Sequence, residues 1–261
     1  MKLDGGSYNN AKTVRDETEI LVGFQSRSQQ VYQSNNSVRH IFYGEDAREK
    51  IDWFISSQPL RGTIIFIHGG YWQSCNKEDF AFIVTAPLHA GFDVMLIEYS
   101  LAPLVPLQKI HQQIGAALDV IYSLVDIKMP VYLSGHSAGG HLAACWQTHP
   151  LVTATLAISG IFELSPLLAT TINQQLQLTA EDVSQLSPLR HPPASPSAIT
   201  LYYGTDELPE LIAQSERYAQ VLSQHSVLVE CVAVAGANHY TILDALFSTD
   251  GLILKSILNN R

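Results

Sequence analysis

The chain has 261 residues, of which 46% are hydrophobic and 15% are charged, and its net charge is −9 at pH 7. A chain of this length and apolar content can bury one large core as a single α/β domain. Its lysines and arginines are scattered, whereas binding to a phosphate backbone needs a concentrated basic face. The composition therefore argues against a nucleic-acid partner and favours a small-molecule substrate, and it leaves a homodimer open.

The sequence shows no pattern of export or membrane insertion. Residues 1–10 are polar and lack the apolar core of a signal peptide. The longest apolar runs, such as Val94–Ile97, are far too short to span a bilayer. Cys75, Cys145 and Cys231 lie far apart without metal-ligand spacing, which predicts buried free thiols and no metal site. We expect a cytoplasmic protein with no membrane attachment and no cofactor.

In chain order, a polar lead-in segment over residues 1–37 precedes a regular alternation of elements. Unbroken apolar runs and β-branched residues are typical of strands that are buried on both faces. Strands are predicted at Val38–Tyr43, Lys50–Ile55, Thr63–Ile67, Val94–Ile97, Val131–Leu133, Leu156–Ile158, Ile199–Tyr203 and Val227–Val234. Apolar residues at helical spacing predict amphipathic helices over residues 110–125 and 211–222.

This alternation predicts an α/β fold with a mostly parallel central sheet and helices on both faces. Residues 160–196 interrupt the alternation and are rich in Pro, Gln, Ser and Thr. We interpret them as a small cap inserted over the carboxyl edge of the sheet, where ligands bind in such folds. The whole chain, residues 1–261, is expected to form one domain.

A G-x-S-x-G motif at 135–139 follows the buried strand at Val131 and precedes an apolar helix start. This context predicts a nucleophile elbow, in which Ser137 lies on a sharp turn that only glycines on either side permit. The turn also directs the N–H of Ala138 toward the space above Ser137. Ser137 is therefore the candidate nucleophile.

A second glycine motif, His68-Gly69-Gly70-Tyr71-Trp72, follows the most hydrophobic strand. Small residues there let the backbone approach the nucleophile. The N–H groups of Gly69, Gly70 or Tyr71 are then candidates, with that of Ala138, to bind a developing oxyanion.

The candidate general base is His239, which lies after the last strand and before the final helix, so that the chain order is serine, acid, histidine. The acid follows the strand at Ile199 in Gly204-Thr205-Asp206-Glu207. The spacing G-x-x-acid favours Glu207, while Asp206 stays open as the alternative.

Taken together, these motifs resemble the arylformamidases (kynurenine formamidases) of the α/β-hydrolase superfamily, over roughly residues 38–250. The stretches that carry the resemblance are HGGYWQS at 68–74 with Lys77, GHSAG at 135–139, SGIFEL at 159–164, Glu181-Asp182, Ser187-Pro188, Arg190-His191, Pro209-Glu210 and Gln214-Ser215. The first stretch is specific, because wider esterase and lipase families usually carry a third glycine where Tyr71 stands. The acid of the family lies two residues before its Pro-Glu pair, which again selects Glu207, although better-known members have aspartate there.

The resemblance implies an α/β-hydrolase fold and hydrolysis of an N-formyl arylamine, such as N-formylkynurenine, through a formyl-serine intermediate. Tyr71, Trp72 and Phe162 would then line an aromatic substrate pocket. The predicted cap from Gly160 to Leu189 contains no Lys or Arg that could bind the carboxylate of N-formylkynurenine. Arg190 is near in sequence, and Lys12, Arg15 and Arg27 become candidates if the lead-in segment covers the site. A carboxylesterase for small acyl or aryl esters is the alternative, and a non-catalytic binding protein is disfavoured by the intact motifs.

Overall fold

The computed structural model describes residues 6–194, 197–225 and 227–259. Residues 1–5 of the predicted lead-in segment and residues 195–196 of the predicted cap therefore lie outside the described residues. Strands are present at all of the predicted places. They are β1 (Ser37–Phe42), β2 (Lys50–Phe54), β3 (Gly62–Ile67), β4 (Phe92–Ile97), β5 (Val131–His136), β6 (Ala154–Ile158), β7 (Ser197–Gly204) and β8 (Val227–Val234).

Within the described residues these strands form one eight-stranded sheet in the order β1-β2-β4-β3-β5-β6-β7-β8. The pairs β1/β2 and β2/β4 are antiparallel, and every later pair is parallel. The prediction of a mostly parallel sheet is confirmed. Because β3, β5, β6, β7 and β8 run in the same direction, the loops that follow them lie at one edge of the sheet, where functional residues gather in such folds.

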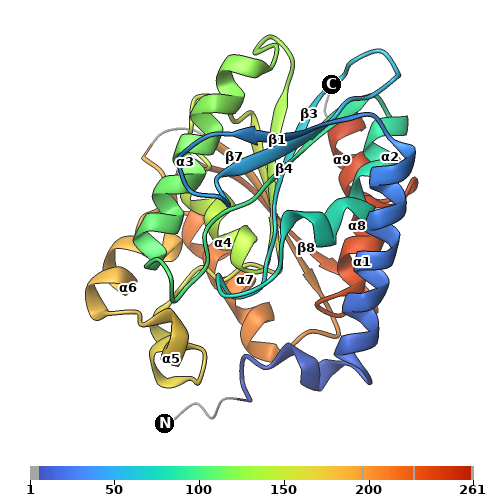
Figure 1. Ribbon diagram of the computed structural model, residues 1–261. Helices are drawn as coiled ribbons and strands as arrows, with labels where there is room; N and C mark the ends of the chain where they lie inside the picture. The colour runs from blue at the N-terminus through green and yellow to red at the C-terminus, as the bar shows by residue number, and fades with distance from the viewer. Residues whose placement is uncertain (1–5, 195–196, 226, 260–261) are drawn as a thin grey trace.

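The helices form a layer on each side of the sheet (Figure 1). The α-helices are α1 (Glu17–Ser34), α2 (Thr85–His89), α3 (Leu107–Leu124), α4 (Ala138–Cys145), α5 (Asn173–Leu176), α6 (Ala180–Leu186), α7 (Pro209–Leu222), α8 (Thr241–Phe247) and α9 (Leu252–Asn259). Short 3₁₀ helices are η1 (Asn10–Thr13), η2 (Lys77–Val84), η3 (Ser165–Ala169) and η4 (Pro188–Arg190). None of the helices in the described ranges is long and apolar enough to cross a membrane.

The side chains of the central strands alternate between two apolar layers, as the pleat of a strand requires. Ile65 and Ile67 of β3 pack with α3 and α4, whereas Ile64 and Phe66 of the same strand pack with α1, α8 and α9. All four are buried with at most 1% exposure. The unbroken apolar run of β3 thus exists because both faces of the strand are covered.

The lead-in segment is mostly one long helix that packs on the second layer. Asp16 caps α1, since its Oδ1 accepts a hydrogen bond from the N–H of Glu19 at 3.0 Å. Phe24 and Val31 then bury one face of α1 against the sheet layer. This packing draws the N-terminal residues across the molecule toward the carboxyl edge of the sheet.

The cysteines are free thiols, as predicted, but they are not all buried. Cys75 and Cys145 are half-buried, and Cys231 is exposed. The prediction of buried thiols was therefore wrong for all three. Cys231 is the most exposed because β8 is the edge strand of the sheet and its side chains are only partly covered.

A buried ion pair joins β2 to η2 at the rim of the second layer. Lys77 Nζ lies 3.0 Å from Asp52 Oδ2, and both side chains are at most 1% exposed. Burial alone would raise the pKa of Asp52. The N–H of His40 and the ammonium of Lys77 more than offset this effect, so its pKa lies below the ordinary value. The carboxylate is therefore charged in the interior and depends on its partners.

Replacing Lys77 with Met should lower the free energy of unfolding by about 3–5 kcal/mol, because the buried Asp52 carboxylate would lose its close cation and keep only the more exposed Arg39, whose Nε lies 3.5 Å away. Lys109→Met is the matched control. Lys109 is half-exposed and its Nζ lies 3.8 Å from Glu49, so its loss should cost about 1 kcal/mol or less. Urea unfolding of both variants measures the difference, and equal costs would contradict the importance of the buried pair.

Candidate active site

Ser137 lies at the turn between β5 and α4 with φ 56° and ψ −117°, a conformation that L-residues rarely adopt. Its N–H donates a 2.8 Å hydrogen bond to the carbonyl of Ile158, at the end of β6. Such strain costs about 1–3 kcal/mol and persists only where the surroundings enforce it. The strained turn lifts the Ser137 side chain out of the sheet at its carboxyl edge.

The glycines of the motif are required by close backbone contacts. A Cβ atom on Gly135 would lie 2.1 Å from the carbonyl oxygen of Gly139, and one on Gly139 would lie 2.0 Å from that of Ile67. Gly69 approaches from the other side, where a Cβ atom would lie 3.0 Å from Ser137 Cβ. The three glycines therefore let β3, β5 and α4 converge on the serine.

His239 and Glu207 meet at the same edge of the sheet. Nδ1 of His239 lies 3.0 Å from Oε2 of Glu207, and both residues are buried. Since a carboxylate only accepts hydrogen bonds, Nδ1 carries the proton of the neutral ring and Nε2 is left free to accept one. Oε1 of Glu207 accepts from Ser159 Oγ at 2.6 Å and from the N–H of Gly204 at 2.7 Å. The carboxylate is thus held by three donors.

Asp206 does not reach His239. It is exposed, and its side chain accepts a 3.2 Å hydrogen bond from Thr205 Oγ1. Its N–H donates to the carbonyl of Ala237, which ties the loop after β7 to the loop after β8. The structure therefore brings Glu207 to the histidine and turns Asp206 toward solvent.

His136, the variable residue of the elbow, contacts His239 through a hydrogen bond and through its ring. Its Nε2 lies 2.8 Å from the carbonyl oxygen of His239, and the two rings are 4.6 Å apart. Burial lowers the pKa of His136 well below its ordinary value, and the neighbouring His239 lowers it further. His136 is therefore neutral and donates its Nε2–H to this carbonyl.

The loop after β3 runs past Ser137 in an unusual backbone conformation. Gly70 has φ 100°, and Tyr71 and Trp72 follow with φ 50° and 58°. Gly70 is required there, because a Cβ atom would lie 2.3 Å from the carbonyl oxygen of Ser74. Within the described part of the chain, no protein acceptor pairs with the main-chain N–H of Gly70 or Tyr71. These donors are available to a ligand beside Ser137.

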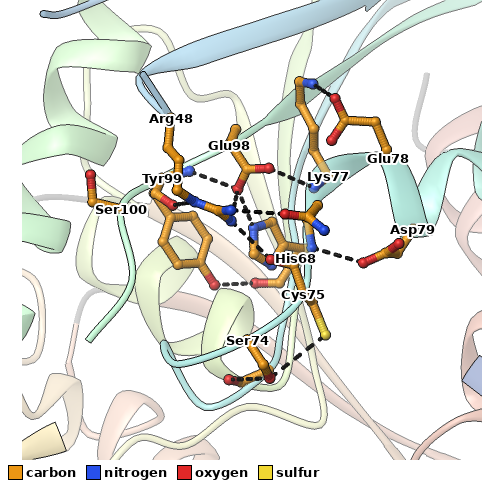
Figure 2. A network of polar contacts seen from close by, with 12 residues as sticks. Arg48, His68, Ser74, Cys75, Lys77, Glu78, Asp79, Glu98, Tyr99 and Ser100 are labelled. Atoms are coloured by element: carbon orange, nitrogen blue, oxygen red, sulfur yellow. Dashed lines mark hydrogen bonds and ion pairs between the residues drawn. The ribbon is translucent and has the colours of Figure 1, made fainter. Parts of the chain in front are cut away.

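A buried carboxylate, that of Glu98, anchors this loop (Figure 2). Its Oε1 lies 2.9 Å from His68 Nε2 and 2.6 Å from the guanidinium of Arg48. Oε2 accepts from the N–H of Lys77 at 3.1 Å. Burial alone would raise the pKa of Glu98, but His68 and Arg48 more than offset it and hold the pKa below its ordinary value. Tyr99 completes the anchor, since its hydroxyl donates to the carbonyl of His68 at 2.9 Å.

A cavity of about 550 Å³, its open mouth included, lies above Ser137 and His239. From the predicted site, Gly70 and Tyr71 also line it, together with His136 of the elbow, which was not predicted as a site residue. The remaining lining residues are Asn10, Glu17, Leu21, Phe24, Ser74, Cys75, Phe80 and Tyr240. Four of these come from the lead-in segment. The sequence reasoning missed them because nothing in a polar N-terminal pattern indicates the distant sheet edge to which it returns.

Trp72 and Phe162 do not line this cavity, and their assignment to the substrate pocket is corrected. Both side chains are fully buried. Trp72 packs edge-on against His141 with ring centroids 5.0 Å apart, and Phe162 stacks on Tyr218 at 4.6 Å. Both rings therefore pack in the hydrophobic core and do not face the cavity. Tyr71 alone of the three lies at the cavity.

The segment 160–196 forms η3, α5, α6 and η4 between β6 and β7. Gln73 Nε2 donates to the carbonyl of Ile172 at 2.8 Å, so the segment contacts the loop after β3. None of its described residues lines the cavity above Ser137, which is covered instead by η1 and α1. In the described ranges, no group of three or more His, Cys, Asp or Glu side chains is arranged to hold a metal ion.

The family of the chain follows from this geometry and from its relatives. A family model described as an alpha/beta hydrolase fold matches residues 64–243, which include Ser137, Glu207 and His239. The sheet order, the elbow and the loop geometry thus belong to an α/β hydrolase, and the fold prediction is confirmed.

Similarity to two fish proteins places the chain in a particular family of α/β hydrolases. The kynurenine formamidase of Danio rerio is 28% identical over 260 residues, which span 94% of this chain and 88% of that protein. The kynurenine formamidase of Salmo salar is 30% identical over 232 residues, which span 83% and 79%. The chain belongs to the arylformamidase (kynurenine formamidase) family of the α/β-hydrolase superfamily, and it is a hydrolase.

Among solved structures, a candidate thioesterase from Silicibacter sp. TM1040 superposes with a TM-score of 0.91. It is 24% identical and is covered to 99%, as is this chain. At this identity the likeness shows the shared fold alone.

Glu98→Gln should destabilise the protein at pH 7, because Arg48 and His68 would lose their buried anionic partner. The pKa of Glu98 is lowered in the folded state, so its stabilising charge is complete above the ordinary value of 4.5 and is lost as the pH falls through the folded-state pKa. The difference in unfolding free energy between wild type and Glu98→Gln should therefore shrink below about pH 4.5. Urea titrations at several pH values test this, and a pH-independent difference would contradict it.

Proposed function

We propose that the protein hydrolyses N-formyl arylamines to formate and the free arylamine, with Ser137 as nucleophile, His239 as general base and Glu207 as the acid that orients the histidine. The observation that carries the proposal is that Ser137, His239 and Tyr71 line one cavity, with Glu207 hydrogen-bonded behind His239. Membership of the arylformamidase family supports the formyl group as the acyl part.

In the first half of the reaction, Ser137 Oγ attacks the formyl carbon while Nε2 of His239 takes the hydroxyl proton. Glu207 stabilises the imidazolium that forms. The N–H groups of Gly70, Tyr71 and Ala138 are the candidate donors to the oxyanion. Gly69 contributes by its lack of a side chain, which lets this loop approach Ser137.

His239 then donates its Nε2 proton to the departing aniline nitrogen, which leaves as the neutral arylamine. In the second half, the same histidine takes a proton from water, which attacks the formyl-serine ester. Collapse of the second oxyanion releases formic acid, which ionises to formate in water, while His239 returns its proton to Ser137 Oγ. No step requires a metal or a cofactor.

Ser137→Ala and His239→Ala should each reduce kcat by about 10³-fold or more, because triad members act as a unit. The double variant should be little worse than either single one. Steady-state hydrolysis of a formanilide measures the losses, and circular dichroism checks that the variants are folded. A single variant that keeps most of its kcat would refute the assignment.

Glu207→Gln should lower kcat severely, because among the described residues Glu207 is the hydrogen-bond partner of His239 Nδ1. Asp206→Asn is the matched control and should cost less than about tenfold, since the side chain is exposed and makes no contact with the histidine. Comparison of the kcat values of the two variants, measured on the same formanilide, shows which carboxylate orients His239. The reverse ranking would transfer the role to Asp206.

The ratio kcat/KM should fall steeply from formyl to acetyl to butyryl anilides with one aryl leaving group. Tyr71 is the bulky residue where wider esterases carry glycine, and a group that clashes with it loses more than the ~1 kcal/mol that a methylene gains. Tyr71→Gly should flatten the series, and the left-handed φ of 50° suits glycine at this position.

The same acyl series on phenyl esters separates the proposal from its alternative. If butyryl esters were the best substrates of the wild-type enzyme, the formamidase assignment would fail and a small-acyl carboxylesterase would take its place. Both outcomes use the same triad, so the acyl preference is the deciding measurement.

A further inference from the structure

We propose that the cavity above Ser137 contains a recognition site for an ammonium group on the aryl part of the substrate, formed by Glu17 and Asn10. The inference rests on the proposed function only for the reaction at Ser137. It assigns a binding role to two residues of the N-terminal segment and a charge to the substrate.

Glu17 provides the charge. It is the first residue of α1, it is half-buried, and it lines the cavity together with Ser137 and His239. The hydroxyl of Tyr240 donates a short hydrogen bond to its Oε1. Within the described ranges no Lys, Arg or His forms an ion pair with Glu17. A carboxylate that is withdrawn from water without a cation is stabilised by a cationic ligand.

Asn10 provides an independent acceptor in the same cavity. It is only 6% exposed, and its Oδ1 is a buried side-chain oxygen without a hydrogen-bond partner in the described structure. Its Nδ2 donates to the hydroxyl oxygen of Tyr71 at 3.4 Å, which leaves Oδ1 as the unused atom. Buried acceptors of this kind are rare in native proteins unless a ligand or water satisfies them.

The two tyrosine hydroxyl groups at the cavity already donate to protein acceptors. The Tyr71 hydroxyl donates to the carbonyl of Tyr8 at 2.6 Å, and that of Tyr240 donates to Glu17. Away from Ser137 and the loop after β3, the side chains of Glu17 and Asn10 therefore add acceptors to the lining. An ammonium group has three donors and no acceptor, so its chemistry matches this lining.

The four cations named as candidates in the sequence analysis do not offset the negative charge of Glu17. Arg27 forms an exposed ion pair with Asp244, and Arg190 pairs with Glu163 through two 2.8 Å hydrogen bonds. Lys12 and Arg15 are exposed. None of the four lines the cavity. A carboxylate on the same part of the substrate would meet Glu17 without a compensating charge, whereas an ammonium would be paired.

The test compares three formanilides that differ only at one meta position, with an aminomethyl group (cationic), an ethyl group (neutral) or a carboxylate (anionic). The measured quantity is the ratio of kcat/KM between the cationic and the neutral substrate at pH 7. It is determined for wild type, for Glu17→Gln and for Glu19→Gln. Glu19→Gln is the matched control. It removes the same charge from the same helix, but at an exposed position that does not line the cavity.

We expect wild type to favour the cationic substrate by about tenfold or more and to disfavour the anionic one. The reason is that a partly desolvated carboxylate attracts a cation and repels an anion more strongly than it would in water. Glu17→Gln should bring the ratio to within about twofold of unity, and Glu19→Gln should keep the wild-type ratio. A ratio, unlike a rate, is insensitive to a general loss of activity. Asn10→Ala should lower the ratio in the same direction.

Two results would overturn the inference: a wild-type ratio near unity, or equal decreases in Glu17→Gln and Glu19→Gln. The same three substituents on phenyl acetates separate this failure from that of the proposed function. If the enzyme cleaves esters but not formanilides, the cation preference is read on the esters. If it cleaves formanilides without a cation preference, the ammonium site alone is wrong.

Discussion

The structure depends on one close approach of backbones around Ser137. Gly135 and Gly139 leave no room for a Cβ atom between β5, the start of α4 and the end of β3. Gly69 does the same on the opposite side of the serine. Because three segments converge there without side chains between them, the strained φ of Ser137 is enforced by its neighbours, and the loop after β3 runs beside the candidate nucleophile. A larger residue at any of these glycines would separate the parts of the site.

Buried charges keep these loops in place. The chain is poor in charged residues, yet it buries the carboxylates of Asp52 within β2, of Glu98 directly after β4 and of Glu207 in the loop after β7. Each accepts hydrogen bonds from main-chain N–H groups as well as from side chains. A buried carboxylate satisfied in this way fixes the direction of the chain around it, and a half-satisfied one would destabilise it. The loops of the candidate active site are thus held by polar contacts, whereas the sheet beneath them is held by apolar packing.

The cavity above Ser137 is covered by the N-terminal segment and not by the segment inserted between β6 and β7. Residues 160–196 contact the loop after β3 but do not line the cavity. The N-terminal segment does, through η1 and the first turns of α1, and the hydroxyl of Tyr71 fastens it by donating to the carbonyl of Tyr8. Tyr71 therefore links the loop after β3 to the N-terminal residues that line the cavity. In an α/β hydrolase functional residues gather at the carboxyl edge of the sheet, and here an N-terminal helix covers that edge.

The sequence by itself determined the eight strands, their mostly parallel order, and the turns that bear Ser137 and His239, because these depend on local apolar patterns and on glycines near in sequence. Only the tertiary structure showed which of Glu207 and Asp206 lies beside His239. Adjacent residues point in different directions, and the hydrogen bonds between the loops after β7 and β8 determine which one faces the histidine. Only the tertiary structure, too, placed Trp72 in the core and Glu17 in the cavity. Burial of an aromatic ring and the path of a polar segment depend on contacts with elements far away in the chain, and no local pattern records those contacts.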